Sequence, residues 1–320
     1  MTDVGSAVSA VGGIDEETWG VLLMAYGTPG SLDDVEAYYT HIRRGRAPSP
    51  EQLAALIGRY EAVGGVTPLR EITFEQARKV EARLRAAGMP ARVFVGMKHW
   101  HPYVAEAVRE MGAAGVRQAV GLVLAPHYSR MSAGQYIEYA EKEREQSCPE
   151  LSLRYVERWG ANPVYTAELG RRVAAALGEW EPETAEVVFT AHSLPVRIRS
   201  WGDPYERELA ETAGLVAAAS GAPHWSFAFQ SASATGEPWL GPDLLERLSL
   251  IARAGERRNV LVCPIGFVAD HLEVLYDLDI EAATRCRELG LGFRRTPMLN
   301  ADAPLVEAVS REILAVSRAK

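Results

Sequence analysis

Short apolar segments alternate with longer amphipathic segments along this chain, and this alternation restricts the fold more than any other feature. The apolar segments are typical of strands buried on both faces, because a strand with one wet face would alternate apolar and polar residues. The amphipathic segments, such as residues 71–88 and 203–220, are typical of helices that cover a sheet. The strand-like segments are residues 20–25, 92–95, 119–125 and 153–156, followed by residues 186–190, 226–229, 260–264 and 293–295.

Four strand-like segments in each half of the chain predict two doubly wound α/β domains, each with a four-stranded parallel sheet. A stretch that carries Gly, Asn and Pro, residues 159–165, marks the boundary between them. We therefore expect an N-terminal domain at residues 19–160 and a C-terminal domain at residues 161–300. Residues 1–18 are expected to form a flexible tail, and residues 301–320 a closing helix.

Composition and missing motifs exclude several classes of protein. The net charge of −8 argues against a nucleic-acid binder. No apolar run approaches the roughly 18 residues of a membrane span, and the N-terminus lacks the basic segment of a secretion signal. We therefore expect a cytoplasmic protein without an integral membrane segment. The phosphate-binding glycine motifs and the G-x-S-x-G elbow are absent, which disfavours dinucleotide enzymes, nucleotide hydrolases and serine hydrolases.

Residues that follow the predicted strands are the first candidates for a site, because open α/β sheets bind ligands beyond the carboxyl ends of their strands. Tyr26, His99 and His127 follow the first three strands. His192 follows the first strand of the second half, and His271 lies beyond the third. A histidine at a strand end often only hydrogen-bonds a neighbouring loop, and this structural interpretation stays open for each one. His192 is the strongest functional candidate because it precedes a tight Ser-Leu-Pro turn.

Four carboxylates form a regular pattern in the second half. Asp270, Glu273, Asp277 and Glu281 are spaced by three, four and four residues, which predicts one face of a helix with the first two acids in its first turn. A solvated helix face is the simple interpretation. The alternative is a path for a hard or borderline cation, because the helix dipole stabilises only the first two carboxylates and oxygen ligands suit such ions.

Arginines gather in one region of this acidic protein. Arg43, Arg44, Arg46 and Arg59 all lie within residues 38–69. They form either a solvated basic loop or a clamp for carboxylates or phosphates, because arginine matches both groups through two parallel hydrogen bonds.

The chain contains, in this order, the motifs LLMAYGTP, YYTHIRRGR, RYEAVGGVTPL, GMKHWHP, LAPHYS, AHSLP, GDPY, EPWLGPD and GFVADHLEVLYD. This series resembles the ferrochelatase family, and is most similar to bacterial coproporphyrin III ferrochelatases. The resemblance implies two Rossmann-like doubly wound domains of the chelatase type with a porphyrin in the cleft. It implies insertion of Fe2+ into coproporphyrin III to form coproheme in haem biosynthesis, with Fe2+ as substrate and no organic cofactor.

The resemblance also implies roles for individual residues. His192 and Glu273 are the expected catalytic pair and the expected Fe2+ ligands, as metal ligand, as proton acceptor, or as both in turn. Tyr26 is expected to contact the porphyrin from its opposite side as a catalytic and substrate-binding residue. Asp277 and Glu281 are the expected outer divalent site, with Mg2+ as its candidate ion. The residues expected to hold propionates are Arg43, Arg59, Thr67 and Tyr136.

Further expectations concern clusters and partners. Some relatives hold an iron–sulfur cluster on cysteines that lie partly in a C-terminal extension. The three cysteines here form no C-x-x-C pair, and no such extension follows, so we expect no cluster. Coproporphyrin III and Fe2+ are the expected partners, together with a downstream haem-pathway decarboxylase. We expect a monomer.

Three alternatives stay open. The first is a ferrochelatase that accepts protoporphyrin IX at a membrane, although residues 31–48 are charged and Arg-rich, where membrane-associated members have an apolar lip. The second is a chelatase of the same architecture for cobalt and a corrin precursor. The third is a haem or porphyrin carrier without catalysis, which would have no need of Glu273 beside a histidine ligand.

Overall fold

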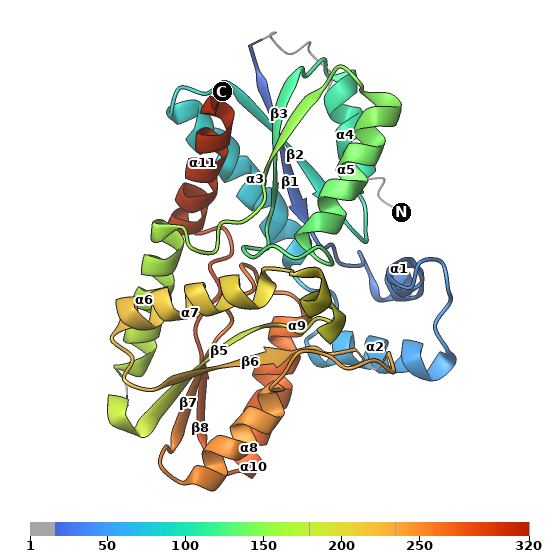
Figure 1. Ribbon diagram of the computed structural model, residues 1–320. Coiled ribbons are helices and arrows are strands. Elements are labelled where there is room, and N and C mark those ends of the chain that lie inside the picture. Colours follow the sequence, from blue (N-terminus) through green and yellow to red (C-terminus); the bar gives the residue numbers. More distant parts are fainter. Residues whose placement is uncertain (1–16, 179, 234, 320) are drawn as a thin grey trace.

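A computed structural model describes residues 17–178, 180–233 and 235–319, so most of the tail predicted at residues 1–18 lies outside the described residues. The described chain forms two four-stranded sheets, and all the strand pairs in these sheets are parallel. Figure 1 shows one sheet above the other. Each predicted strand is present, and the α/β fold class is confirmed. The first sheet contains β1 (Trp19–Ala25), β2 (Ala91–Met97), β3 (Gln118–Val123) and β4 (Ser152–Val156), and the second contains β5 (Ala185–His192), β6 (Trp225–Gln230), β7 (Asn259–Cys263) and β8 (Gly292–Arg295).

The two sheets have the same topology. The strand order is β2-β1-β3-β4 in the first sheet and β6-β5-β7-β8 in the second, so the first strand of each half is central. Central strands are covered on both faces, and residues 21–24 of β1 are fully buried. The strand order reverses at β1 and at β5, because successive strands are added on opposite sides of them, so the carboxyl ends of these strands are the expected place for a ligand.

Helices cover the sheets, and several begin with local capping signals. Ser49 and Gln52 form a capping box at the start of α2, and Asn162 caps α6 with Pro163 at its first position. The helices of the first half are α1 (Val35–Ile42), α2 (Pro50–Ala62), α3 (Leu69–Ala86), α4 (Val104–Ala113) and α5 (Ala133–Ser147). Those that follow are α6 (Pro163–Leu177), α7 (Tyr205–Ser220), α8 (Leu244–Ala254), α9 (Leu272–Leu275), α10 (Ala283–Glu288) and α11 (Ala303–Arg318).

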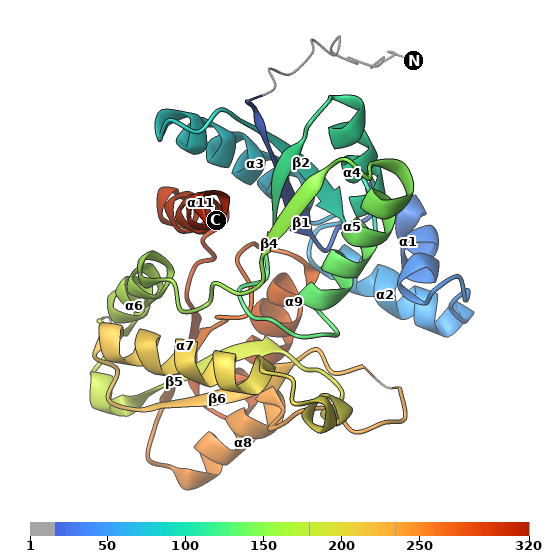
Figure 2. The same cartoon turned by 45° about the horizontal axis from the view of Figure 1, so that its top comes forward.

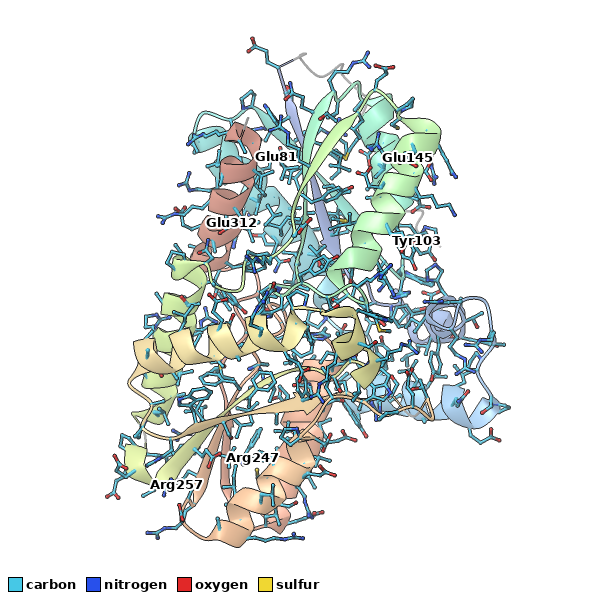
Figure 3. All side chains as sticks on the ribbon, viewed as in Figure 1. Glu81, Tyr103, Glu145, Arg247, Arg257 and Glu312 are labelled. Atoms are coloured by element: carbon cyan, nitrogen blue, oxygen red, sulfur yellow. The ribbon has the colours of Figure 1, made fainter. Side chains whose placement is uncertain are left out.

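The last helix, α11, returns to the first half of the chain and packs beside α3 (Figures 1 and 2). Arg83 of α3 contacts Glu307 of α11 at 2.6 Å. Glu312, labelled in Figure 3, accepts a hydrogen bond of 2.6 Å from the side chain of Asn162. The domain boundaries at residues 160 and 300 remain predictions, and α11 ties the end of the second segment to the first sheet.

One continuous core connects the two sheets. It contains Leu23 of β1, Phe189 of β5 and Val309 of α11, all fully buried or nearly so. Polar contacts add to this connection, because the loop after β3 binds α7: the side chain of His127 lies 2.9 Å from Thr212, and the backbone N–H of Tyr128 donates to Glu208. No helix among the described residues is long and apolar enough to cross a bilayer.

The carboxylate pattern is where the predicted fold needs correction. Asp270 does not lie in a first helical turn, because α9 begins at Leu272 with His271 as its N-cap in extended conformation. The side chains of Arg295 and Asn300 bind the Asp270 carboxylate and hold it before the helix. Residues 277–282 then form a π-helix in which the N–H of Glu281 donates to the carbonyl of Tyr276. Of the four carboxylates, only Glu273, Asp277 and Glu281 therefore belong to the helix, and this helix is irregular.

Candidate active site

Two adjoining cavities lie at the carboxyl ends of the strands of both sheets. Their volumes are about 870 Å3 and 820 Å3. Tyr26, His192 and Glu273 line both of them. Tyr26 directly follows β1, His192 ends β5, and Glu273 lies in α9. The topology therefore brings together three residues that the sequence placed at separate positions, and both cavities meet at them.

His192 is held so that one ring nitrogen faces Glu273. Its Nε2 lies 3.3 Å from Oε1 of Glu273. Its Nδ1 donates to the carbonyl of Ser193, and the hydroxyl of Tyr205 donates to the carbonyl of His192 at 2.9 Å. Burial by itself lowers the pKa of His192, but the Glu273 carboxylate and the Ser193 carbonyl raise it to about 9. The raised pKa means that this pair holds a proton at neutral pH.

Glu273 is the anionic partner of this pair. Burial would raise its pKa, but the charge and hydrogen bond of His192 hold the pKa well below the usual range. His271 adds a second contact, with its Nε2 3.6 Å from Oε2 of Glu273. The side chain of Gln230 donates to the backbone carbonyl of Glu273 at 3.1 Å and fixes the helix against β6.

Close packing between β5 and the loop after β7 sets the distance between the two catalytic candidates. A Cβ atom on Gly266 would lie 2.5 Å from the Cβ and 2.9 Å from the Cα of Ala191, the residue before His192. Only glycine permits this approach. The loop therefore passes directly against the end of β5 before it delivers His271 and Glu273.

Tyr26 faces the same space from the first sheet. Desolvation within the cavity, followed by the charge of Glu273, raises the pKa of Tyr26 above its usual value, so the phenol stays protonated although the side chain is 38% exposed. Its ring packs against that of His99 with centroids 4.6 Å apart. Burial and the nearby Lys98 lower the pKa of His99 to about 3, so this imidazole is neutral. His99 therefore supports Tyr26 by ring packing.

Residues 18–315 match the family model described as Ferrochelatase. This chain belongs to the ferrochelatase family. A ferrochelatase inserts iron into a porphyrin, and the imidazole–carboxylate pair at the junction of two cavities agrees with that activity. The recognition made from the ordered motifs is confirmed.

Known relatives cover nearly the whole chain. The ferrochelatase of Herpetosiphon aurantiacus is 42% identical over 291 residues, which are 90% of this chain and 95% of the relative. The coproporphyrin III ferrochelatase of a Geobacillus species is 42% identical over 300 residues, 92% of this chain and 96% of the relative. The solved sirohydrochlorin chelatase of Bacillus subtilis subspecies spizizenii superposes with a TM-score of 0.59 at 11% identity, over 93% of this chain and 95% of that one. This last likeness shows the fold.

The residues expected to hold propionates divide between the two cavities of the ferrochelatase. Arg43, Arg59 and Thr67 line the second cavity, and Tyr136 lines the first. Thr67 is buried with its hydroxyl 3.1 Å from that of Thr28. Tyr136 is also buried, beneath the ammonium of Lys98, which lies 5.0 Å from its ring centroid. These side chains do not form one cluster.

The expected outer metal site contains an arginine contact that the sequence did not reveal. Arg59 approaches Asp277 at 3.7 Å and Glu281 at 3.9 Å, and its guanidinium lies 4.8 Å from the ring centroid of Tyr276. Burial, followed by the charge of Glu273, raises the pKa of Asp277 to about 6. Ser231 donates a hydrogen bond to Oδ2 of Asp277, while the buried Oδ1 has no hydrogen-bond partner among the residues that the structure describes.

His127 has a structural position although it follows a strand and borders the first cavity. Its side chain is 2% exposed, and its Nε2 lies 2.9 Å from the hydroxyl of Thr212. Burial lowers the pKa of His127 to about 3. The neutral ring joins the two halves of the ferrochelatase, which is the structural interpretation that the sequence left open.

Sequence reasoning missed Ser231 and Gln230, which support the acidic residues from β6. The signal was available, because both residues lie at the carboxyl end of a predicted strand, where ligands of such sheets bind. Ser231 also has a φ of 62°, in the left-handed region that side chains other than glycine seldom adopt. This conformation directs its hydroxyl to Asp277.

Proposed function

We propose that this ferrochelatase inserts Fe2+ into coproporphyrin III. The observation that carries the proposal is the distribution of cations around the cavities. Arg43, Arg46 and Arg59 line the second cavity, and Arg44 and Lys98 line the first. A substrate with carboxylates around its whole edge suits such walls better than one with an apolar edge. Relatives from Geobacillus and Bacillus subtilis, named coproporphyrin III ferrochelatases, are 42% and 40% identical to this chain.

Metal insertion has three costs: Fe2+ loses water, two pyrrole N–H protons leave, and the ring distorts so that nitrogen lone pairs face the metal. Contacts to the propionates, remote from the ring centre, supply binding energy for the distortion. Tyr26 would lie on the opposite side of the ring from His192 and Glu273. Its protonated phenol offers a polar contact without adding a negative charge.

The proton balance follows from the metal-free pair. One proton is held between His192 and Glu273 at neutral pH, so Fe2+ capture by Nε2 and the carboxylate displaces this proton to solvent. Imidazole and carboxylate are both suitable ligands for ferrous iron. When the metal passes to the ring, the vacated imidazole and carboxylate are the nearest bases for the two pyrrole protons. The pair therefore acts first as ligand and then as proton acceptor.

The outer site is proposed to hold a hydrated divalent cation, with Mg2+ as the candidate. The buried Oδ1 of Asp277, which lacks a hydrogen-bond partner, supports this assignment, and Glu281 adds a second oxygen donor. Within the part of the chain that the structure describes, no cluster of three or more histidine, cysteine or acidic side chains could hold a metal. Mg2+ fits such a sparse site because it keeps several of its waters.

The test is a steady-state comparison of coproporphyrin III and protoporphyrin IX with Fe2+ under anaerobic conditions, followed by loss of the metal-free porphyrin spectrum. We expect a higher kcat/KM for coproporphyrin III. Equal values would overturn the choice of substrate. Porphyrin binding without iron-dependent turnover would overturn the enzymatic function and return the protein to the class of carriers.

A further inference from the structure

Lys98 is a buried cation whose ammonium has no anionic partner within the described part of the chain. It follows β2, is 8% exposed and lines the first cavity. Its backbone N–H donates to the carbonyl of Ala25 at 2.9 Å, and its Nζ lies over the ring of Tyr136. No carboxylate in residues 17–178, 180–233 or 235–319 forms an ion pair with it. Charged side chains are seldom buried without such a pair, so the position indicates an anion supplied by a ligand.

A second cation, Arg44, lines the same cavity as Lys98. Burial, followed by the charge of Arg44, lowers the pKa of Lys98 to about 8, which leaves Lys98 mostly protonated at neutral pH. Arg44 also lines the first cavity and has a φ of 57°. Its backbone N–H donates to the carbonyl of His41, which holds this left-handed turn. Two like charges on one cavity wall repel each other, and an anion bound between them offsets this repulsion.

The other arginine on this wall is already paired. Arg109 contacts Glu143 at 2.9 Å and needs no ligand. Glu106, an acidic residue of the same cavity, accepts hydrogen bonds from the backbone of Tyr103 and from His101. Lys98 and Arg44 are therefore the pair on the first cavity wall that remains available to a carboxylate.

The position of this pair relative to the reaction centre carries the inference. Lys98 and Arg44 line the first cavity, while Arg43 and Arg59 line the second, and His192 lies where the two cavities meet. A porphyrin centred at His192 extends into both cavities. Coproporphyrin III has a propionate on every pyrrole ring. Protoporphyrin IX has propionates on two neighbouring rings and apolar vinyl groups on the other two.

We propose that Lys98, assisted by Arg44, binds a propionate on the half of the porphyrin that carries vinyl groups in protoporphyrin IX. Lys98 is thus a specificity-determining residue, and the inference rests on the proposed function. An ammonium facing a vinyl group would stay unpaired and buried, whereas an ammonium facing a propionate gains a charge-assisted hydrogen bond. Lys98 would therefore discriminate between the two porphyrins in two ways: it stabilises bound coproporphyrin III, and it destabilises bound protoporphyrin IX because its ammonium stays unpaired.

The test measures dissociation constants of the metal-free porphyrins by fluorescence, using the full chain. Lys98→Met keeps the length and apolar stem of the side chain and removes its charge. We expect it to weaken coproporphyrin III binding about 10- to 100-fold, the effect of losing one charged hydrogen bond. Protoporphyrin IX binding should stay unchanged or become tighter. Lys98→Arg should restore most of the coproporphyrin III affinity.

Two further variants make the test specific. Arg43→Gln, in the second cavity, should weaken both porphyrins, and Lys142→Met, on the exposed face of α5, should weaken neither. Porphyrin-free Lys98→Met should unfold at the same temperature as the parent or higher, because the change removes an uncompensated buried charge. A purely structural lysine would instead lower that temperature.

The outcomes separate the inference from the function on which it rests. If the parent protein binds and metallates both porphyrins equally, the proposed substrate is wrong. If the parent prefers coproporphyrin III and Lys98→Met keeps the same preference, the role of Lys98 is wrong while the function stands. Equal weakening of both porphyrins by Lys98→Met would also overturn the assignment.

Discussion

The imidazole Nε2 of His192 lies 3.3 Å from the carboxylate Oε1 of Glu273, although one residue ends a strand and the other belongs to a short helix beyond the third strand of the same sheet. The Gly266 loop fixes this distance by packing against Ala191. The pair presents an imidazole and a carboxylate at the point where the two cavities meet.

Replacement of His192 tests the chemical role of this pair. His192→Ala should lower kcat for iron insertion by about 10²- to 10⁴-fold, the usual contribution of a positioned acid–base group. The measurement is anaerobic turnover with Fe2+, combined with a thermal melt to show that the fold is intact. His271→Ala, which removes only the longer 3.6 Å contact to Glu273, should have a smaller effect. A near-normal rate in folded His192→Ala would refute the assignment.

The outer acidic residues should make the enzyme respond to added divalent ions. Asp277→Asn combined with Glu281→Gln removes both negative charges, so stimulation or inhibition by Mg2+ should disappear. Arg59→Gln should instead raise the affinity for Mg2+, because the guanidinium that approaches both carboxylates would no longer compete. Calorimetric titration with Mg2+ measures both effects. An unchanged response in the double variant would mean that these acids form only a solvated helix face.

His127 should make stability fall at mildly acid pH. The pKa of this buried ring is about 3 in the folded protein, against an ordinary value of 6.5. The unfolded chain therefore binds a proton that the folded chain does not, and stability present above about pH 6.5 is lost as the pH falls. By linkage, His127 should cost about 2 kcal/mol between pH 7.5 and pH 5.

The matched variant for this pH effect is His127→Gln, which has no titratable group and can still reach the hydroxyl of Thr212. Urea unfolding of both proteins at several pH values isolates the contribution, because all other groups titrate equally in the two. If the free energies of unfolding of the parent and of His127→Gln change equally between pH 7.5 and pH 5, protonation of His127 does not destabilise the folded protein and the prediction is wrong.

Asn300 connects α3 in the first half of the chain to Asp270, which lies just before α9. Its carbonyl accepts from Gln76 at 2.7 Å, while its side chain donates to the Asp270 carboxylate and accepts from the Asp270 backbone, both at 2.8 Å. Its φ of 49° lies in the left-handed region. Asn300→Gly keeps this backbone and should lose about 1–3 kcal/mol of stability through the lost hydrogen bonds.

A second substitution separates the two contributions of Asn300. Asn300→Ala also loses the hydrogen bonds and adds a left-handed backbone penalty of about 1–2 kcal/mol. The alanine variant should therefore be the less stable of the two in denaturant unfolding. Equal stability of the two variants would show that backbone strain at this position has no cost.

The local pattern of apolar residues was sufficient to predict the strands of both sheets. The apolar runs predicted each strand to within a few residues, because burial on both faces leaves a continuous signal in the sequence. Tyr26 and His192 were identifiable because the ends of such strands are where ligands bind. The pattern of carboxylates was less reliable: α9 starts after Asp270, since Arg295 and Asn300 hold that residue outside the helix.

By itself, the sequence determined the two parallel sheets, the strand ends that carry the site and the family. Tertiary structure alone decided which charges meet: Arg59 with Asp277, His127 with Thr212, and Lys98 with no carboxylate among the described residues. The physical reason is the separation in sequence between the residues that interact. Periodicity and capping depend on residues a few positions apart, whereas an ion pair or an unpaired buried charge depends on distances between elements that only the packed chain brings together.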